Sequence, residues 1–71
     1  MDTQILHSFE KDECEFTISS VKHENNHVEY VVDCWKKDSR GEYSVNHWCL
    51  YYRSKEAATN EFNRWGGAYV P

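Results

Sequence analysis

Hydrophobic and polar residues alternate along most of the chain with a period of two, the spacing typical of β-strands. The alternation is clearest in residues 13–21, 27–37 and 43–52. Because successive side chains of a strand point to opposite faces, each segment is expected to present one apolar face. The pattern therefore predicts a three-stranded antiparallel meander with residues 27–37 in the middle.

After the third segment the period changes to that of a helix. The apolar residues recur at i, i+4 and i+7, on one helical face: Ala58, Phe62 and Trp65. Ser54 precedes them as an N-cap, and a pair of glycines follows them as a stop signal. We expect a helix over residues 55–65 that covers one face of the sheet. The fold class is then α+β, with residues 1–71 in one domain.

The length of the first hairpin loop decides which side chains share a face. Ile18 can lie on the same face as Val32 only if the numbers of paired residues add up to an even value. A three-residue loop closed by His23 and His27 meets this condition and pairs Ile18 with Val32. Asn26 then takes the left-handed conformation that Asn tolerates.

The second loop carries Asp38 and Gly41, which favour a type I turn followed by a left-handed glycine. On the helix side, this turn is expected to pair Trp48 with Val32, Leu50 with Tyr30, and Tyr52 with Val28. On the opposite side it is expected to pair Asp33 with His47, Trp35 with Val45, and Glu29 with Tyr51.

Residues 1–12 fit more than one structure. Ile5, Leu6 and Phe9 lie on one face of a short helix, which Asp2 can cap. The same segment can form an extra edge strand, or cross the uncovered sheet face. Of these alternatives we favour the short helix.

The composition limits the compartment and the partners. Net charge is −4, with −6 in residues 1–35 and +2 in residues 36–71, so bulk attraction to nucleic acid is not expected. Three cysteines without a CxxC pair favour a reducing compartment. Cys14 and Cys34 are expected to be small residues of the core. The chain shows neither a signal peptide nor a stretch of ~20 apolar residues, so we expect a cytoplasmic protein that does not enter a membrane.

The sheet face away from the predicted helix mixes aromatic residues with carboxylates, which is unusual for a solvated face. We interpret it as a surface that binds a protein partner with a basic surface, or as a homodimer interface. The residues expected to carry this interaction are Glu13, Glu15, Glu29, Asp33, Trp35, His47 and Tyr51. No catalytic or metal-binding motif is present, so we expect a protein that is not an enzyme and needs no cofactor or metal.

An alternative function is binding of nucleic acid by the basic residues of the second hairpin and the helix start. These residues are Lys36, Lys37, Arg40, Arg53 and Lys55.

The segment WCLYYRSKEAA, from Trp48 to Ala58, followed by Phe62, resembles the last strand and helix of two DNA-binding modules. These are plant ethylene-response-factor domains and the arm-binding domains of phage integrases. The resemblance covers residues 28–65 and implies three strands and a helix, with the uncovered sheet face in the major groove. It also implies Arg and Lys on that face. Because this chain carries Glu13, Glu15, Glu29 and Asp33 there, we do not transfer DNA binding.

Two further resemblances concern the chain as a whole. An order of helix, three strands and helix is similar to double-stranded-RNA-binding domains, whose basic cluster is reduced here to Arg53 and Lys55. In size and acidity the chain looks like small phage-encoded inhibitors, including anti-CRISPR proteins. That resemblance implies carboxylates that occupy nucleic-acid sites in place of phosphates.

Overall fold

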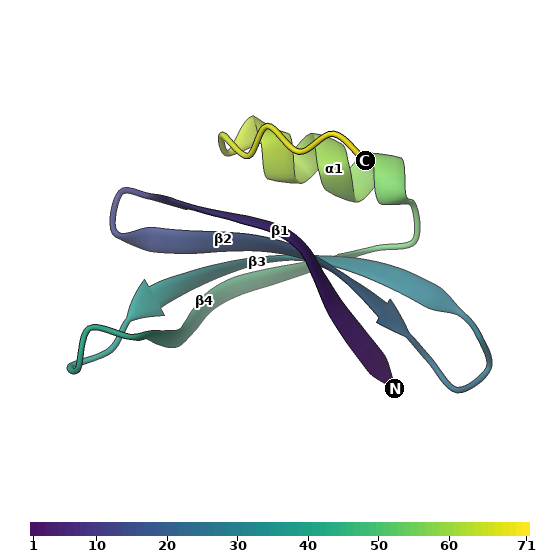
Figure 1. The fold of residues 1–71 in the computed structure, drawn as a ribbon, viewed down its shortest axis with the longest axis horizontal. Helices are drawn as coiled ribbons and strands as arrows, with labels where there is room; N and C mark the ends of the chain where they lie inside the picture. The colour runs from purple at the N-terminus through teal and green to yellow at the C-terminus, as the bar shows by residue number, and fades with distance from the viewer.

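The computed structural model describes residues 1–71 as a four-stranded antiparallel sheet with one helix on one face (Figure 1). The elements are β1 (Asp2–Lys11), β2 (Cys14–Lys22), β3 (Val28–Lys37), β4 (Tyr43–Tyr52) and α1 (Lys55–Arg64). The strands lie in chain order, and α1 packs on β2, β3 and β4. The α+β class is confirmed, but the sheet has four strands rather than three.

The extra strand is β1, so the prediction of a short N-terminal helix is wrong and the edge-strand alternative is correct. A two-residue turn joins β1 to β2, since Lys11 pairs with Cys14. Both turn residues, Asp12 and Glu13, have positive φ, 53° and 61°. This is the backbone of a type I′ turn, whose twist matches that of the flanking strands. Glu13 therefore lies in a turn and not, as expected, at the start of a strand.

The first of the expected hairpins, between β2 and β3, is confirmed in detail. Ile18 pairs with Val32. The backbone N–H of His23 donates to the carbonyl of His27 at 2.8 Å, and Asn26 has a φ of 66°. The odd number of residues in the loop was therefore sufficient to predict which side chains of β2 and β3 share a face.

The β3–β4 hairpin starts as expected and then shifts. Gly41 has a φ of 83°, and Lys37 pairs with Tyr43 in the predicted register. Two β-bulges follow in β4, at Ser44 and His47, and each adds one unpaired residue. The observed helix-side pairs are Trp48 with Cys34, Leu50 with Val32, and Tyr52 with Tyr30, which corrects all three expected pairs. Because the total shift is two residues, these side chains keep their predicted face.

The hydrophobic core lies between α1 and the sheet. Its buried members are Phe16, Ile18, Val32, Cys34, Ala58 and Phe62, with Leu6, Phe9, Cys14, Tyr30, Trp48, Tyr52 and Tyr69 packed against them. Phe62 is fully buried, and burial of such a side chain contributes about 1.5–3 kcal/mol. Two residues expected in the core are not part of it: Leu50 is 39% exposed, and Val28 lies outside the cluster.

Both ends of α1 are capped as the sequence indicates. The side chain of Ser54 accepts a hydrogen bond from the backbone N–H of Ala57 at 3.2 Å. At the C-terminus, Gly66 donates to the carbonyl of Asn63 and Gly67 to that of Phe62, which is a Schellman motif. The helix has ten residues and is neither long nor apolar enough to cross a membrane.

Candidate functional site

The sheet face opposite α1 is concave. In Figure 1 the β2–β3 and β3–β4 hairpins bend away from the helix, so that the middle of the sheet arches toward it. A groove of about 610 Å³ opens on this face. All four strands contribute to its lining, with Thr3 from β1, Val21 from β2, Asp33 from β3 and Tyr51 from β4.

The floor of the groove is buried although no other element covers it. Val31 and Ser19, which pair across β2 and β3, are each 5% exposed. Thr17 on the same face is 6% exposed, in a hollow that Trp35 and Ile5 also line. The curvature of the sheet and the larger neighbouring side chains remove these small residues from water. The site is thus a shaped hollow rather than a flat strand surface.

Large apolar side chains on this face remain in water. Ile5 is 65% exposed, Tyr51 is 67% exposed and Met1 is 78% exposed. Single exposed apolar residues are ordinary, but several around one groove are typical of a binding surface.

Asp33 is the charged group in the middle of the groove. Its Oδ1 accepts a long hydrogen bond from Nδ2 of Asn46, at 3.4 Å. Cys49 pairs with Asp33 across β3 and β4. Burial, and secondly the Asp33 carboxylate, raises the pKa of the Cys49 thiol, so this thiol is uncharged at neutral pH. The side-chain contact between Tyr51 and Cys49 in turn raises the pKa of Tyr51. Asp33 is therefore a carboxylate among neutral, mostly aromatic or sulfur-containing neighbours.

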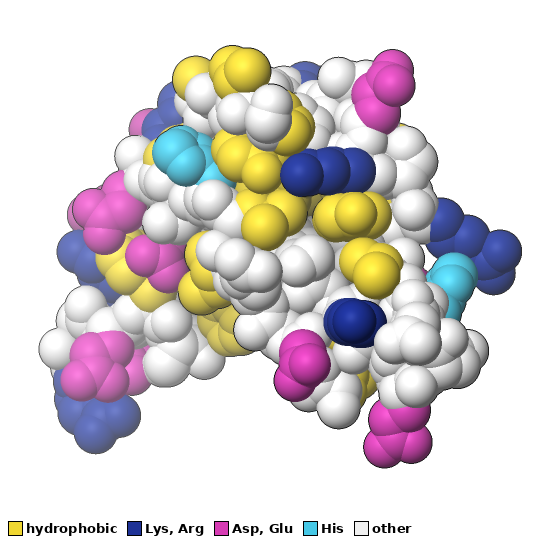
Figure 2. All heavy atoms as spheres, turned by 45° about the vertical axis from the view of Figure 1, so that its right-hand side comes forward, with side chains coloured by type: hydrophobic (Ala, Val, Ile, Leu, Met, Phe, Trp, Pro, Cys, Tyr) yellow, Lys and Arg dark blue, Asp and Glu magenta, His cyan; other side chains and the backbone are white.

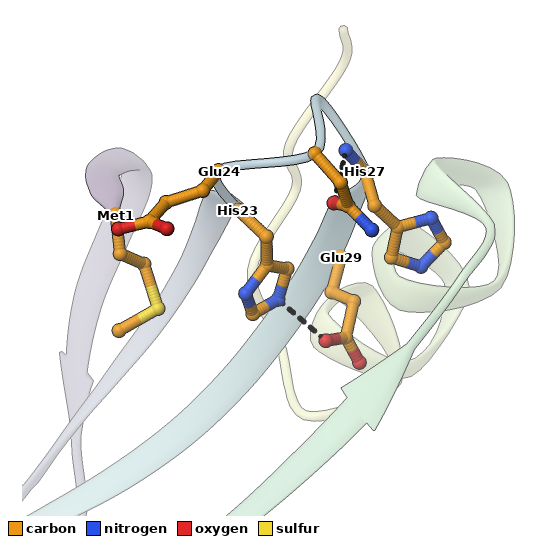
Figure 3. Close-up of a pocket in the computed structure, with 6 residues that line it drawn as sticks. Met1, His23, Glu24, His27 and Glu29 are labelled. Carbon is orange, nitrogen blue, oxygen red and sulfur yellow. Dashed lines mark hydrogen bonds and ion pairs between the residues drawn. The ribbon is translucent and has the colours of Figure 1, made fainter.

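Glu29 lies at one end of the groove and is held by a histidine of the adjacent loop. Nε2 of His23 and Oε1 of Glu29 are 2.7 Å apart. Figure 3 marks this contact with a dashed line. A shallow polar hollow continues from this pair past Glu24 and His27 (Figure 3). No three His, Cys, Asp or Glu side chains in the chain are arranged to ligate one metal ion.

Five of the seven partner-binding residues predicted from sequence lie on the concave face: Glu15, Glu29, Asp33, Trp35 and Tyr51. The expected placement on this face is wrong for Glu13, which lies in the β1–β2 turn. It is also wrong for His47, which lines a hollow on the helix side beside Trp48.

The two bulges of β4 explain the misplaced pairs. Asp33 pairs with Cys49 instead of His47, Trp35 with Asn46 instead of Val45, and Tyr51 with Val31 instead of Glu29. Cys49 therefore takes the place predicted for His47, and Asn46 the place predicted for Val45. Val45 pairs instead with Lys36 and lies on the helix side. No residue type between 43 and 48 marks a bulge, so sequence reasoning had no local signal for Asn46.

The basic residues of the alternative function lie in two separate places. Lys36, Lys37 and Arg40 are at the β3–β4 hairpin, whereas Arg53 and Lys55 follow the other end of β4. A ten-residue strand separates the two groups by about 30 Å. Arg40 is also paired with Asp38 and Glu42 of its own turn, at 3.8 and 3.5 Å. On the side of the molecule drawn in Figure 2, acidic and basic side chains are interspersed, with no continuous basic patch.

The protein is a small antiparallel α+β domain with one open, concave sheet face. Comparison with models of protein families, with characterised proteins and with solved structures finds no match. The concave face is therefore interpreted from its own chemistry.

Proposed function

We propose that this protein is a non-enzymatic interaction protein that binds a basic surface of another protein through the concave face of its sheet. The observation that carries the proposal is the groove opposite α1, in which Asp33 lies among Val31, Trp35 and Tyr51. Aromatic side chains in such a setting act as anchors of protein interfaces, because they bury a large area at little entropic cost.

The charges on this face suit a basic partner. Glu15 and Asp33 form no ion pair within the chain, and Glu29 is paired only with His23. A lysine or arginine of the partner that reaches Asp33 would complete a charge pair in a partly desolvated groove. Such pairs contribute mainly to specificity and to the rate of association.

The partner class that this pattern suits best is a nucleic-acid-binding protein, with the three carboxylates in the positions of phosphates. The support is the distribution of charge, since residues 1–35 carry −6 and include β1 and β2 entire with most of β3. This class of partner is also the one implied by the resemblance in size and acidity to phage-encoded inhibitors.

A pull-down from cell lysate, followed by affinity measurement with the purified partner, tests the proposal. Asp33→Lys and Trp35→Ala should each weaken binding at least about tenfold, because both remove groups from the centre of the groove. Glu56→Lys makes the same charge change as Asp33→Lys but on the exposed side of α1, and should leave binding unchanged. If both groove variants retain every partner of the wild type, the concave face is not the binding surface.

Self-association through the same face would give a different result. Light scattering would then show a mass that rises with concentration and that Trp35→Ala returns to that of a monomer. A concentration-independent monomer leaves the face available for a different protein.

A further inference from the structure

The hollow beside Trp48, of about 370 Å³, lies on the helix side of the sheet, beyond the C-terminal end of α1. Phe16 and Cys34, both buried, belong to the core at its base, and Trp48 and Trp65 lie beside them. The ring centroids of the two tryptophans are 5.2 Å apart, and that of Trp65 is 5.7 Å from Phe16. Trp65 is nevertheless 42% exposed. The core thus ends here in an aromatic surface that is open to water.

The orientation of Trp65 is set by a hydrogen bond. Its indole Nε1 donates to Oε2 of Glu61 at 2.9 Å, one turn earlier on α1. The ring is therefore held in place without being covered. An aromatic face that is both oriented and exposed is suited to stacking with another planar ring.

Two lysines stand next to this aromatic surface. Lys11 pairs with Cys14 across β1 and β2, and Cys14 pairs with Lys36 across β2 and β3. The three residues form one row across the sheet, and they share a face because they are direct partners. With strands about 4.8 Å apart, the backbones of the two lysines are about 10 Å apart. Neither lysine forms an ion pair within the chain.

Besides the thiols of Cys14 and Cys34, the other titratable side chains that line the hollow are His47 and Asp12. The lining thus carries two lysines against one carboxylate, in a protein whose net charge is −4. Local positive charge beside an open aromatic surface is complementary to a ligand that combines a ring with an anion. The volume falls in the range of small-molecule sites, roughly 300–1,000 Å³.

We propose that this hollow binds a small planar aromatic molecule that carries an anionic group. The ring lies against Trp65 and Trp48, and the anion lies between Lys11 and Lys36. A nucleoside monophosphate and an aromatic carboxylate share this chemistry. This site is independent of the concave face, because it lies on the opposite side of the sheet.

The three tryptophans allow a direct test by NMR of the full-length, ¹⁵N-labelled protein. Adenosine monophosphate and indole-3-acetate represent the two sources of the anion, and adenosine and inorganic phosphate each supply one half of the ligand. The indole N–H signals of Trp48 and Trp65 should shift with at least one ring-bearing anion, whereas that of Trp35, on the other face, should not. Adenosine and inorganic phosphate should each bind at least about tenfold more weakly than adenosine monophosphate if phosphate is the anion.

Lysine variants test the second half of the proposal. Lys11→Ala and Lys36→Ala should each weaken binding about tenfold, whereas Lys22→Ala, an exposed lysine at the other end of β2, should not. The proposal is overturned if neither ring-bearing anion shifts the Trp48 and Trp65 signals at about 10 mM. It is also overturned if inorganic phosphate binds as well as both ring-bearing anions, or if Lys22→Ala weakens binding as much as the other two variants.

Discussion

Asn63 and Tyr69 are joined by two hydrogen bonds between the side-chain amide of the first and the backbone of the second. Nδ2 of Asn63 donates to the Tyr69 carbonyl at 2.9 Å, and Oδ1 accepts from the Tyr69 N–H at 2.7 Å. The pair holds the segment after α1 against the helix, so that the Tyr69 ring stacks on His7, with centroids 5.5 Å apart. One edge of the core is therefore closed by a segment outside any helix or strand.

Replacement of Asn63 by Ala should release this segment. We expect the free energy of unfolding to fall by about 1–2 kcal/mol, since two partly buried hydrogen bonds are lost and Tyr69 loses its position. Urea denaturation followed by tryptophan fluorescence measures the change. Asn60→Ala, at an exposed position of the same helix, should be neutral or slightly stabilising because Ala favours helices. Equal effects of the two variants would show that the amide of Asn63 does not hold the segment.

Gly67→Ala should also destabilise the fold, through a steric clash with Phe62. A Cβ at position 67 would lie 2.3 Å from Cε2 of the Phe62 ring, which is fully buried and cannot move away. We expect a loss of about 1–3 kcal/mol in thermal or chemical denaturation. Phe62→Leu replaces the ring with a smaller aliphatic side chain, so the double variant should lose less than the two single variants combined. Strict additivity would contradict the clash.

Glu13→Gly should stabilise the protein. Glu13 has a φ of 61°, and a non-glycine residue in this region is strained by roughly 1–2 kcal/mol. Glycine removes the strain but loses more entropy on folding, so the expected gain in unfolding free energy is about 0.5–1 kcal/mol. Glu10→Gly, inside β1, should instead lower stability by about 0.5–1 kcal/mol. A destabilised Glu13→Gly protein would argue against the type I′ turn.

Stability should decline in alkaline solution because of Cys34. Burial, and secondly the neighbouring Cys14, raises the pKa of the Cys34 thiol from 9.0 to about 11. Between these values the unfolded chain releases this proton while the folded chain retains it, so rising pH favours unfolding. The loss from pH 9 to pH 11 is about 2 kcal/mol in reducing buffer. Urea denaturation across this range should show a shallower decline for Cys34→Ala, and an unchanged decline would remove Cys34 as the cause.

Most of the concave face, but not all of it, could be predicted from local sequence patterns. The alternation of β3 and the odd loop between His23 and His27 placed Glu29, Asp33 and Trp35 on the side away from the helix, as observed. The turn at Gly41 was also correct. No residue type in the sequence marks the two bulges that follow this turn. A bulge depends on the twist of the strand and on its pairing with the neighbouring strand, which are not local properties. That is why His47 was expected at the site and Asn46 was not.

The sequence by itself determined three strands, one capped helix and the face on which most side chains lie. The hydrophobic period, the odd length of the hairpin loops and the capping residues that determine them are all local properties of the chain. Only the tertiary structure decided that residues 2–11 form a fourth strand. Their alternation is broken by a bulge between Ile5 and His7, and the turn that follows contains no glycine. The tertiary structure also decided the curvature that makes the open face a groove, and the meeting of Lys11, Lys36 and Trp65. These features depend on strand pairing and sheet twist between residues far apart in the chain, which no local pattern encodes.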